Sequence, residues 1–285
     1  MPDQDVQLGL YSDNCKLFYA TARPSTSQGL LGLGSIDFQT DPMIALLDGN
    51  DVIATSLSET IDKLVREYGV SRVCFTVPAP MECWSMVPKP VFDDPKEWRI
   101  HLDILMRGSE LESIETHWFE LSNRDFRLVC IRDHSLGTKL AELLPREISI
   151  QLRSEFELGT LWMNHSQFRG SFLTVSAANG VVTVCSYMLG KLRAATYFSF
   201  EDTRDIPYLW LQHTSHLPWI EGMHEYSIIY GDNSEEIIRI LDTFLKDTPE
   251  RIIMNSLKKM NLPTNEETYP FPLERSFPAT LLAVT

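Results

Sequence analysis

Three histidines close together in the sequence, His213, His216 and His224, are the first residues whose types and spacing could do chemistry. His213 and His216 are three positions apart, so on a helix they share one face, where two imidazoles can bind a metal ion such as Zn²⁺. The sequence has no HExxH pattern and specifies no carboxylate ligand beside them. We therefore expect surface or packed histidines rather than a metal site.

Two acidic clusters could supply paired carboxylates for the acid–base chemistry that glycosidases use. The clusters contain Asp93, Asp94 and Glu97, and Glu110, Glu112 and Glu115. Acidic residues are also favoured at helix N-termini and on solvated faces. Because the sequence gives no sign of a cleft between them, we expect these two structural roles.

The five cysteines could act as nucleophiles or metal ligands, but their spacing supports neither role. They are Cys15, Cys74, Cys83, Cys130 and Cys185. No CxxC pair and no local Cys/His signature is present, and most lie in apolar runs where a thiol packs as a small hydrophobe. We expect reduced thiols in a reducing compartment.

The run GLLGLG at residues 29–34 is similar to a glycine-rich nucleotide loop. A functional loop of this kind needs a strand before it and a helix after it. Here the run lies inside an apolar stretch typical of a strand, and the sequence has no GxxxxGK[ST] loop. We therefore predict a strand.

The charge of the chain argues against two classes of partner. The 285 residues carry a formal net charge of -14, whereas nucleic acids and anionic lipids are bound by clusters of Lys and Arg. The acidic N-terminus shows no signal-peptide pattern, and the uncharged stretch 170–190 contains an Asn179-Gly180 turn, which predicts a hairpin rather than a membrane span. We predict a cytoplasmic protein that binds no nucleic acid and does not span a membrane.

Alternating strands and helices must position any site, and the first half of the chain opens with three strands. We predict strands at Val6–Tyr11, Cys15–Ala22, Gly29–Phe38 and Arg72–Val77, with a helix from Ser56 or Ser58 to Gly69. The proline-rich stretch Met81–Asp94 predicts a loop. Beyond it we predict a helix over Pro95–Arg107 capped by Asp94, a hairpin of Ile114–Leu121 and Phe126–Ile131, a helix over His134–Leu144, and a strand followed by a helix or connector over Ile148–Met163.

The second half repeats this opening. We predict strands at Phe172–Ala177, Val181–Met188, Arg193–Ser199, Glu225–Tyr230 and Ile252–Met254, a loop over Thr264–Pro272, and helices over Asp202–His216, Glu235–Leu245 (capped by Asn233 or Ser234) and Pro278–Val284. Each half thus contains one ββαβ-type unit, which indicates an internal duplication. We predict an α/β fold of two lobes, residues 1–160 and 161–285, around a central cleft.

Four stretches carry a resemblance to a known family: LGLYSDNCKLF, VSAANGVVT, SIIYGDNSEEIIRIL and SFPATLLAV. In this order they resemble the actin-like ATPase superfamily, in which each lobe is a ribonuclease-H-like unit and the nucleotide lies between the lobes. Within it, the chain is similar to the bacterial branch of type IV pilus PilM proteins and type II secretion L cytoplasmic domains, or to an uncharacterised bacterial family with this fold. The resemblance implies a duplicated ribonuclease-H-like fold.

The resemblance also implies a cofactor site, whose vestigial positions are Ser12, Asn14, Lys16, Ser176, Asn179, Gly180, Gly231, Asp232 and Ser234. In this comparison Gly9 and Ser176 stand where the family has Asp, and Tyr11 stands where it has Gly. Neutral side chains cannot replace the carboxylates that hold Mg²⁺, and a tyrosine crowds the backbone amides that approach phosphate. We therefore expect no required cofactor and at most weak ATP binding.

Three functions stay open at this point. The first is a non-catalytic scaffold for protein partners, with a homodimer also considered; it is favoured by the aromatic segment Tyr208–Met223, since aromatic side chains are enriched at interfaces. The alternative is a nucleotide-dependent ATPase or small-molecule kinase with atypical motifs. The third is a sensor that closes on a small ligand in the cleft.

Overall fold

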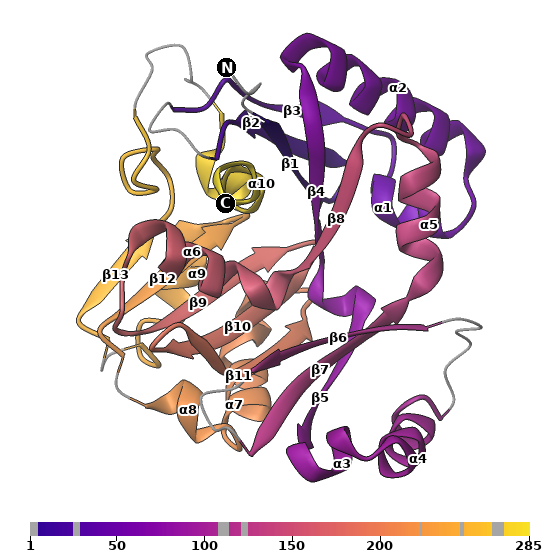
Figure 1. Cartoon of the computed structure of the whole chain (residues 1–285). Coiled ribbons are helices and arrows are strands. Elements are labelled where there is room, and N and C mark those ends of the chain that lie inside the picture. Colours follow the sequence, from indigo (N-terminus) through magenta and orange to yellow (C-terminus); the bar gives the residue numbers. More distant parts are fainter. Residues whose placement is uncertain are drawn as a thin grey trace.

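The computed structural model describes residues 5–24, 29–107, 114–120, 125–222, 224–245, 248–263 and 271–285. It contains two five-stranded sheets and one three-stranded sheet (Figure 1). None of the helices in these ranges is both long and apolar enough to cross a membrane. The predicted duplication is present, because the two larger sheets have the same strand order.

The first sheet is built from the N-terminal half of the chain. Its strands are β1 (Val6–Asp13), β2 (Lys16–Ala22), β3 (Gly32–Asp37), β4 (Val70–Val77) and β8 (Ser149–Ser154), in the order β3-β2-β1-β4-β8. The first three strands are antiparallel, whereas β4 and β8 run parallel to β1. Helices α1 (Pro42–Leu47), α2 (Asp51–Tyr68) and α5 (His134–Glu142) cover one face with an apolar core (Figure 1).

The second sheet repeats the first. Its strands are β9 (Ser171–Ala178), β10 (Val181–Met188), β11 (Lys191–Ser199), β12 (Tyr226–Gly231) and β13 (Glu250–Ile253), in the order β11-β10-β9-β12-β13. Helices α7 (Ile206–Thr214), α8 (Pro218–Glu221) and α9 (Ser234–Ile240) pack on its outer face. The stretch 170–190 is the predicted hairpin, and Asn179 and Gly180 both have the positive φ that a tight turn requires.

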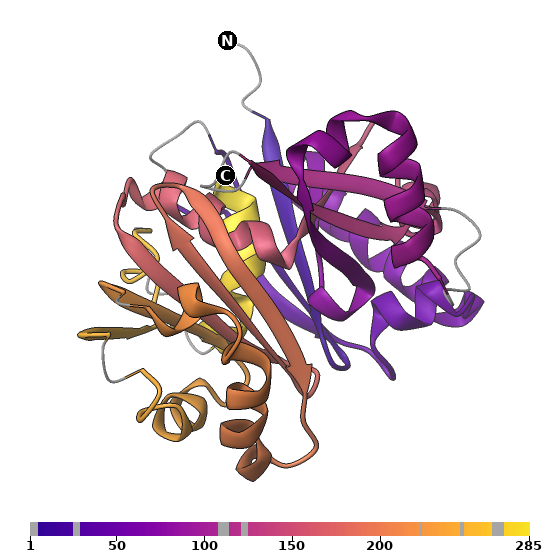
Figure 2. The ribbon, with the colours of Figure 1, turned by 90° about the horizontal axis from the view of Figure 1, so that it is seen from below.

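Two helices fill the space between the large sheets. They are α6 (Leu158–Ser166) and α10 (Leu273–Val284), the latter in yellow in Figure 2. Side chains from both sheets join these helices in one core. Helix α10 packs directly on β1 at Gly9, where an added Cβ would collide with the carbonyl oxygen of Ala279. The last helix of the chain therefore packs against the first strand, and the lobe boundary at 160/161 stays a prediction.

The third sheet corrects one prediction. The stretch Met81–Asp94 is not a loop, because β5 (Glu82–Pro88) and α3 (Lys89–Asp93) lie within it. Strand β5 pairs with β7 (Phe126–Asp133), which pairs with β6 (Ile114–Glu120), and α4 (Pro95–Leu105) follows α3. Strand β5 is at the edge of this sheet and has its only proline, Pro88, at its last position, where a missing N–H is tolerated. The predicted hairpin is confirmed over its described residues; Leu121 lies outside them.

Several helix boundaries also differ from the predictions. Helix α2 begins at Asp51, not at Ser56 or Ser58, because the Asn50 side chain caps it by accepting from the Ile53 N–H at 3.2 Å. Helix α1 was not predicted. Helix α9 ends at Ile240 and not at Leu245, and α10 begins at Leu273 and not at Pro278. The caps at Gly69 and Asp94 are confirmed. Most of the predicted loop Thr264–Pro272 lies outside the described residues.

The histidines, the acidic clusters and the GLLGLG run are part of the packing and the helix and strand ends of the fold. His224 is buried with its Nε2 3.0 Å from Ser186 Oγ, and the His213 ring stacks on Phe198. Asp94 and Glu97 lie at the N-terminus of α4, as expected, whereas Glu110 and Glu112 lie outside the described residues. The GLLGLG run enters β3, as predicted.

Candidate functional site

The turns of two hairpins, one from each lobe, touch each other. The Asn14 N–H, between β1 and β2, donates to the side-chain oxygen of Asn179, between β9 and β10. In return, the Asn179 N–H donates to Asp13 Oδ1 at 3.3 Å. These hydrogen bonds join residues 165 and 166 positions apart in the chain and bridge the two large sheets.

A buried ion pair fixes this contact. The Asp13 side chain is fully buried, and Arg275 of α10 donates from Nε to Asp13 Oδ2 at 2.8 Å. Burial raises the pKa of Asp13, and Arg275 opposes that rise. Asn179 also donates to Asp41, the N-cap residue of α1, at 3.4 Å. We call the set Asp13, Asn14, Asp41, Asn179 and Arg275 the interlobe clasp.

Bulky and charged side chains fill the space behind the clasp. Tyr11 is buried there, and burial raises its pKa. Glu155, whose pKa burial also raises, accepts hydrogen bonds from Ser176 Oγ at 2.6 Å and from the Ala79 N–H at 3.0 Å. The cavity that remains, beside Tyr11, Glu155 and Asn179, has a volume of about 30 Å³. That is enough for water, whereas drug-sized ligands occupy roughly 300–1,000 Å³.

The structure brings some of the predicted site residues together. Asn14 and Asn179 are in the clasp, Gly180 shapes its turn, and Ser12 and Ser176 are buried nearby. Lys16 is not among them, because it pairs with Asp37 on the exposed edge of β2 and β3.

The predicted positions after β12 form a turn beside Ala177. Gly231 has a φ of 96°, the Asp232 N–H donates to the Ala177 oxygen at 2.6 Å, and Ser234 Oγ donates to the Gly231 oxygen at 2.9 Å. Asn233, not Ser234, is the N-cap residue of α9. That any of the nine positions contacts a nucleotide stays a prediction.

Sequence reasoning missed the charged residues of this region. The pattern of the sequence did not indicate Asp13, Asp41, Glu155 or Arg275 as site residues. Gly9, matched to a family Asp, lies in mid-strand against α10, away from the turn. An acidic residue at the end of a strand is on its own only a weak indication of a functional site. Arg275, the partner of Asp13, is 262 residues away in the chain.

A much larger groove of about 820 Å³ lies beside the clasp. Its walls come from α1, β5, the end of α4, β7, and the second-lobe strands β10 and β11. The apolar lining comprises Ile44, Leu47, Pro78, Pro80, Met81, Trp84, Leu105, Met106, Ile131, Val181 and Tyr197. Asp48, Glu82 and Asp133 add carboxyl groups, and Asn179 lines both this groove and the small cavity. The groove is therefore apolar with acidic edges.

A buried polar network fixes the third sheet beside this groove. Arg132 Nη1 lies 3.2 Å from Glu82 Oε1, and its Nη2 lies 3.1 Å from Glu115 Oε1. The Ser154 hydroxyl at the end of β8 donates to Glu82. Burial raises the pKa of Glu82 to about 7, although Ser154 and Arg132 oppose the rise. These contacts fasten β5, β6 and β7 to the first sheet.

Comparison with known proteins identifies the fold. No protein-family model and no curated protein matches the sequence. Among solved structures, the PilM–PilN type IV pilus biogenesis complex matches with 13% identity over 98% of this chain and 97% of that chain, at a TM-score of 0.65. A Bacteroides thetaiotaomicron protein with an actin-like ATPase fold and unknown function matches with 14% identity over 88% and 94%, at 0.55. The cytoplasmic domain of EpsL from Vibrio cholerae matches with 11% identity over 80% and 82%, at 0.47.

The chain thus has the two-lobed actin-like ATPase fold that the sequence predicted. The resemblance to the PilM branch is confirmed at the level of fold.

Replacing Arg275 by leucine should destabilise the protein by about 3 kcal/mol, because the buried Asp13 carboxylate loses its cation. Without Arg275 the pKa of Asp13 in the folded state rises further, so the folded state holds a proton that the unfolded state releases above about pH 4. The stability of Arg275→Leu relative to wild type should therefore fall as the pH rises from the folded-state pKa of Asp13 in the wild type to its higher pKa in the variant, and stay low above it. Urea unfolding at about pH 4 and about pH 8 measures this difference.

Two controls accompany that variant. The double variant Asp13→Asn/Arg275→Leu should recover most of the lost free energy, since a neutral amide needs no cation. Arg204→Leu removes an exposed arginine that pairs with Asp202 and should unfold at the same urea concentration as the wild type. A loss in Arg275→Leu that does not change with pH would contradict the electrostatic role of the clasp.

Proposed function

We propose that this protein is a non-catalytic member of the actin-like fold class that acts as a scaffold for protein partners. The observation that carries the proposal is the direct hydrogen bonding between the Asn14 and Asn179 turns. In the family resemblance these turns hold the nucleotide phosphates between the lobes. In this protein the two turns are hydrogen-bonded to each other, and the cavity beside them has a volume of only about 30 Å³.

The side chains behind the turns support the same proposal. A Mg²⁺ ion needs several oxygen ligands with free lone pairs. The Asp13 carboxylate is bound by Arg275 and Asn179, and that of Glu155 by Ser176 and Ala79. Within the described ranges, no group of three or more His, Cys, Asp and Glu side chains is placed to hold a metal ion.

The groove is the proposed partner site. Its volume of about 820 Å³ and its apolar lining suit the side chains of a partner segment, and its carboxyl groups Asp48 and Asp133 favour a segment that also carries Lys or Arg. The PilM structure, which shares this fold, is of a complex with PilN. We place the protein in the cytoplasm, without nucleic acid; a homodimer stays a prediction.

A nucleotide-dependent ATPase or small-molecule kinase is the second candidate. It is favoured by one observation: Glu155, a buried carboxyl group, lies between the lobes beside Ser176 and Tyr11. A carboxyl group whose pKa is raised by burial can serve as a general base. The closed turns must then separate to admit the substrate.

Calorimetry separates the two candidates. Titration with ATP and Mg²⁺ should give no binding tighter than about 1 mM, and no phosphate release, because the clasp leaves no room for the phosphates. The Glu155→Gln variant should behave identically. Micromolar binding with turnover in the wild type, lost in Glu155→Gln, would replace the scaffold proposal with the enzyme.

Photocrosslinking tests the groove in cells of the source organism. A p-benzoylphenylalanine at position 44, on the groove wall, should give one discrete crosslinked partner. The matched control is position 52, because Ile44 and Val52 are both exposed apolar residues of first-lobe helices, at 49% and 75%, and only Ile44 lines the groove. Equal crosslinking at both positions, or none at position 44, would argue against the groove as the partner site.

A further inference from the structure

A second apolar surface lies on the outside of the second lobe, over α7 and α8. Tyr208, Leu211 and Trp219 are exposed there by 69%, 50% and 53%. All three belong to the aromatic segment that the sequence analysis associated with an interface. Aromatic side chains exposed together on a folded surface are a mark of protein contact sites.

One arginine in this surface, Arg193, has no acidic partner among the residues that the structure describes. The Arg193 guanidinium of β11 stacks on the Trp219 ring, with its central carbon 4.5 Å from the ring centroid. Its buried Nε has no hydrogen-bond partner, and no carboxylate in the described ranges forms an ion pair with it. By contrast, Arg204 and Arg251 each pair with an Asp. In a chain with a net charge of -14, a fixed and unpaired arginine is a localised positive site.

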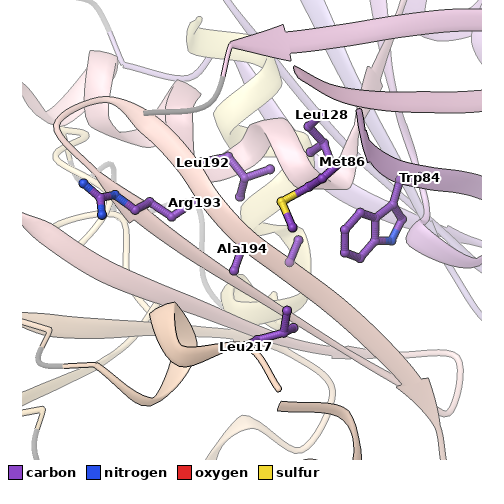
Figure 3. A pocket seen from close by; sticks show the side chains of 8 residues that line it. Trp84, Met86, Leu128, Leu192, Arg193, Ala194 and Leu217 are labelled. Atoms are coloured by element: carbon purple, nitrogen blue, oxygen red, sulfur yellow. The ribbon is translucent and has the colours of Figure 1, made fainter. Parts of the chain in front are cut away.

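A shallow hollow adjoins this arginine. Figure 3 shows Met86 from the third sheet facing Leu192 and Ala194 of β11, with Leu217 at the edge and the Arg193 side chain extending away from them. The hollow has a volume of about 10 Å³, which is room for about one methyl group at the tip of an aliphatic side chain. An apolar hollow beside an unpaired guanidinium therefore offers two contacts of different chemistry a short distance apart.

We propose that this surface docks a segment of a partner protein in which a Glu or Asp stands next to an aliphatic side chain. The carboxylate pairs with the Arg193 guanidinium, which presents two parallel N–H donors to the two carboxylate oxygens. The aliphatic side chain packs on the hollow and on Trp219. Trp and Arg at the centre of such a contact supply most of its binding energy.

Charge favours an acidic partner segment over an anionic membrane and over a second copy of the chain, which could also cover this surface. An anionic membrane is held by several Lys and Arg side chains together, and one arginine provides too little attraction. A second copy of the chain would bring a net charge of -14 against another, so its approach is repelled at long range. A short acidic and aliphatic segment satisfies the arginine with little such repulsion.

Selection from a phage-displayed library of random twelve-residue peptides tests the proposal on the full chain. Peptides recovered on the wild type should be enriched in Glu or Asp beside Leu, Ile or Val, although the protein is itself acidic. Measured by fluorescence anisotropy, their binding should weaken at least tenfold in Arg193→Gln and further in Arg193→Glu. The matched control Arg204→Gln changes an exposed arginine that is already paired and should leave affinity unchanged. Circular dichroism verifies that each variant is folded.

The outcomes also separate this surface from the groove. The Ile44→Asp variant, which changes the groove wall, should bind the recovered peptides as tightly as the wild type does. Peptides that no longer bind Ile44→Asp but still bind Arg193→Glu would belong to the groove and would overturn this inference alone. Recovery of basic peptides, or of none, overturns it as well. A dimer in analytical ultracentrifugation that Arg193→Glu abolishes would show that a second copy, not an acidic partner segment, is the occupant.

Discussion

The contact between the two hairpin turns is the constraint on which the rest of the structure depends. Asp13 ends β1 inside the protein, and a buried carboxylate needs a cation and hydrogen-bond donors. Arg275 provides the cation from α10, and Asn179 provides a donor from the opposite lobe. Helix α10 can reach Asp13 only because β1 has no side chain at Gly9, so backbone packing and electrostatics fix the same arrangement.

Because the two lobes touch at the clasp, the space large enough for a ligand lies beside the clasp and not between the lobes. Between the lobes, Tyr11 and Glu155 leave about 30 Å³, whereas the groove beside the clasp offers about 820 Å³. The groove lies between the third sheet and α1. The third sheet is fastened to β8 of the first sheet through Glu82, Arg132 and Ser154. The largest space beside the lobes is thus a mainly apolar groove. Asn179 belongs to both the clasp and this groove.

The sequence was sufficient to predict the repeated sheet order but not the chemistry between the sheets. Turns such as Asn179-Gly180 and the apolar runs around them are local signals, and they placed most strands correctly. Strand β5 was missed because the prolines in and around it were interpreted as a loop, and the predicted start of α2 was too late because Asn50 was not recognised as its cap. The pairing of Asp13 with Arg275 joins opposite ends of the chain, so no pattern within a local window could indicate it.

The central claim is that contacts within the protein, not a nucleotide, hold the lobes together. Pulsed electron paramagnetic resonance measures this directly, with spin labels at position 52 on α2 and position 212 on α7, and with the exposed Cys15 and Cys83 replaced by serine. The account predicts one narrow distribution of distances between the labels, identical without nucleotide and with saturating ATP and Mg²⁺. A broad distribution that narrows or shifts when ATP and Mg²⁺ are added would contradict it.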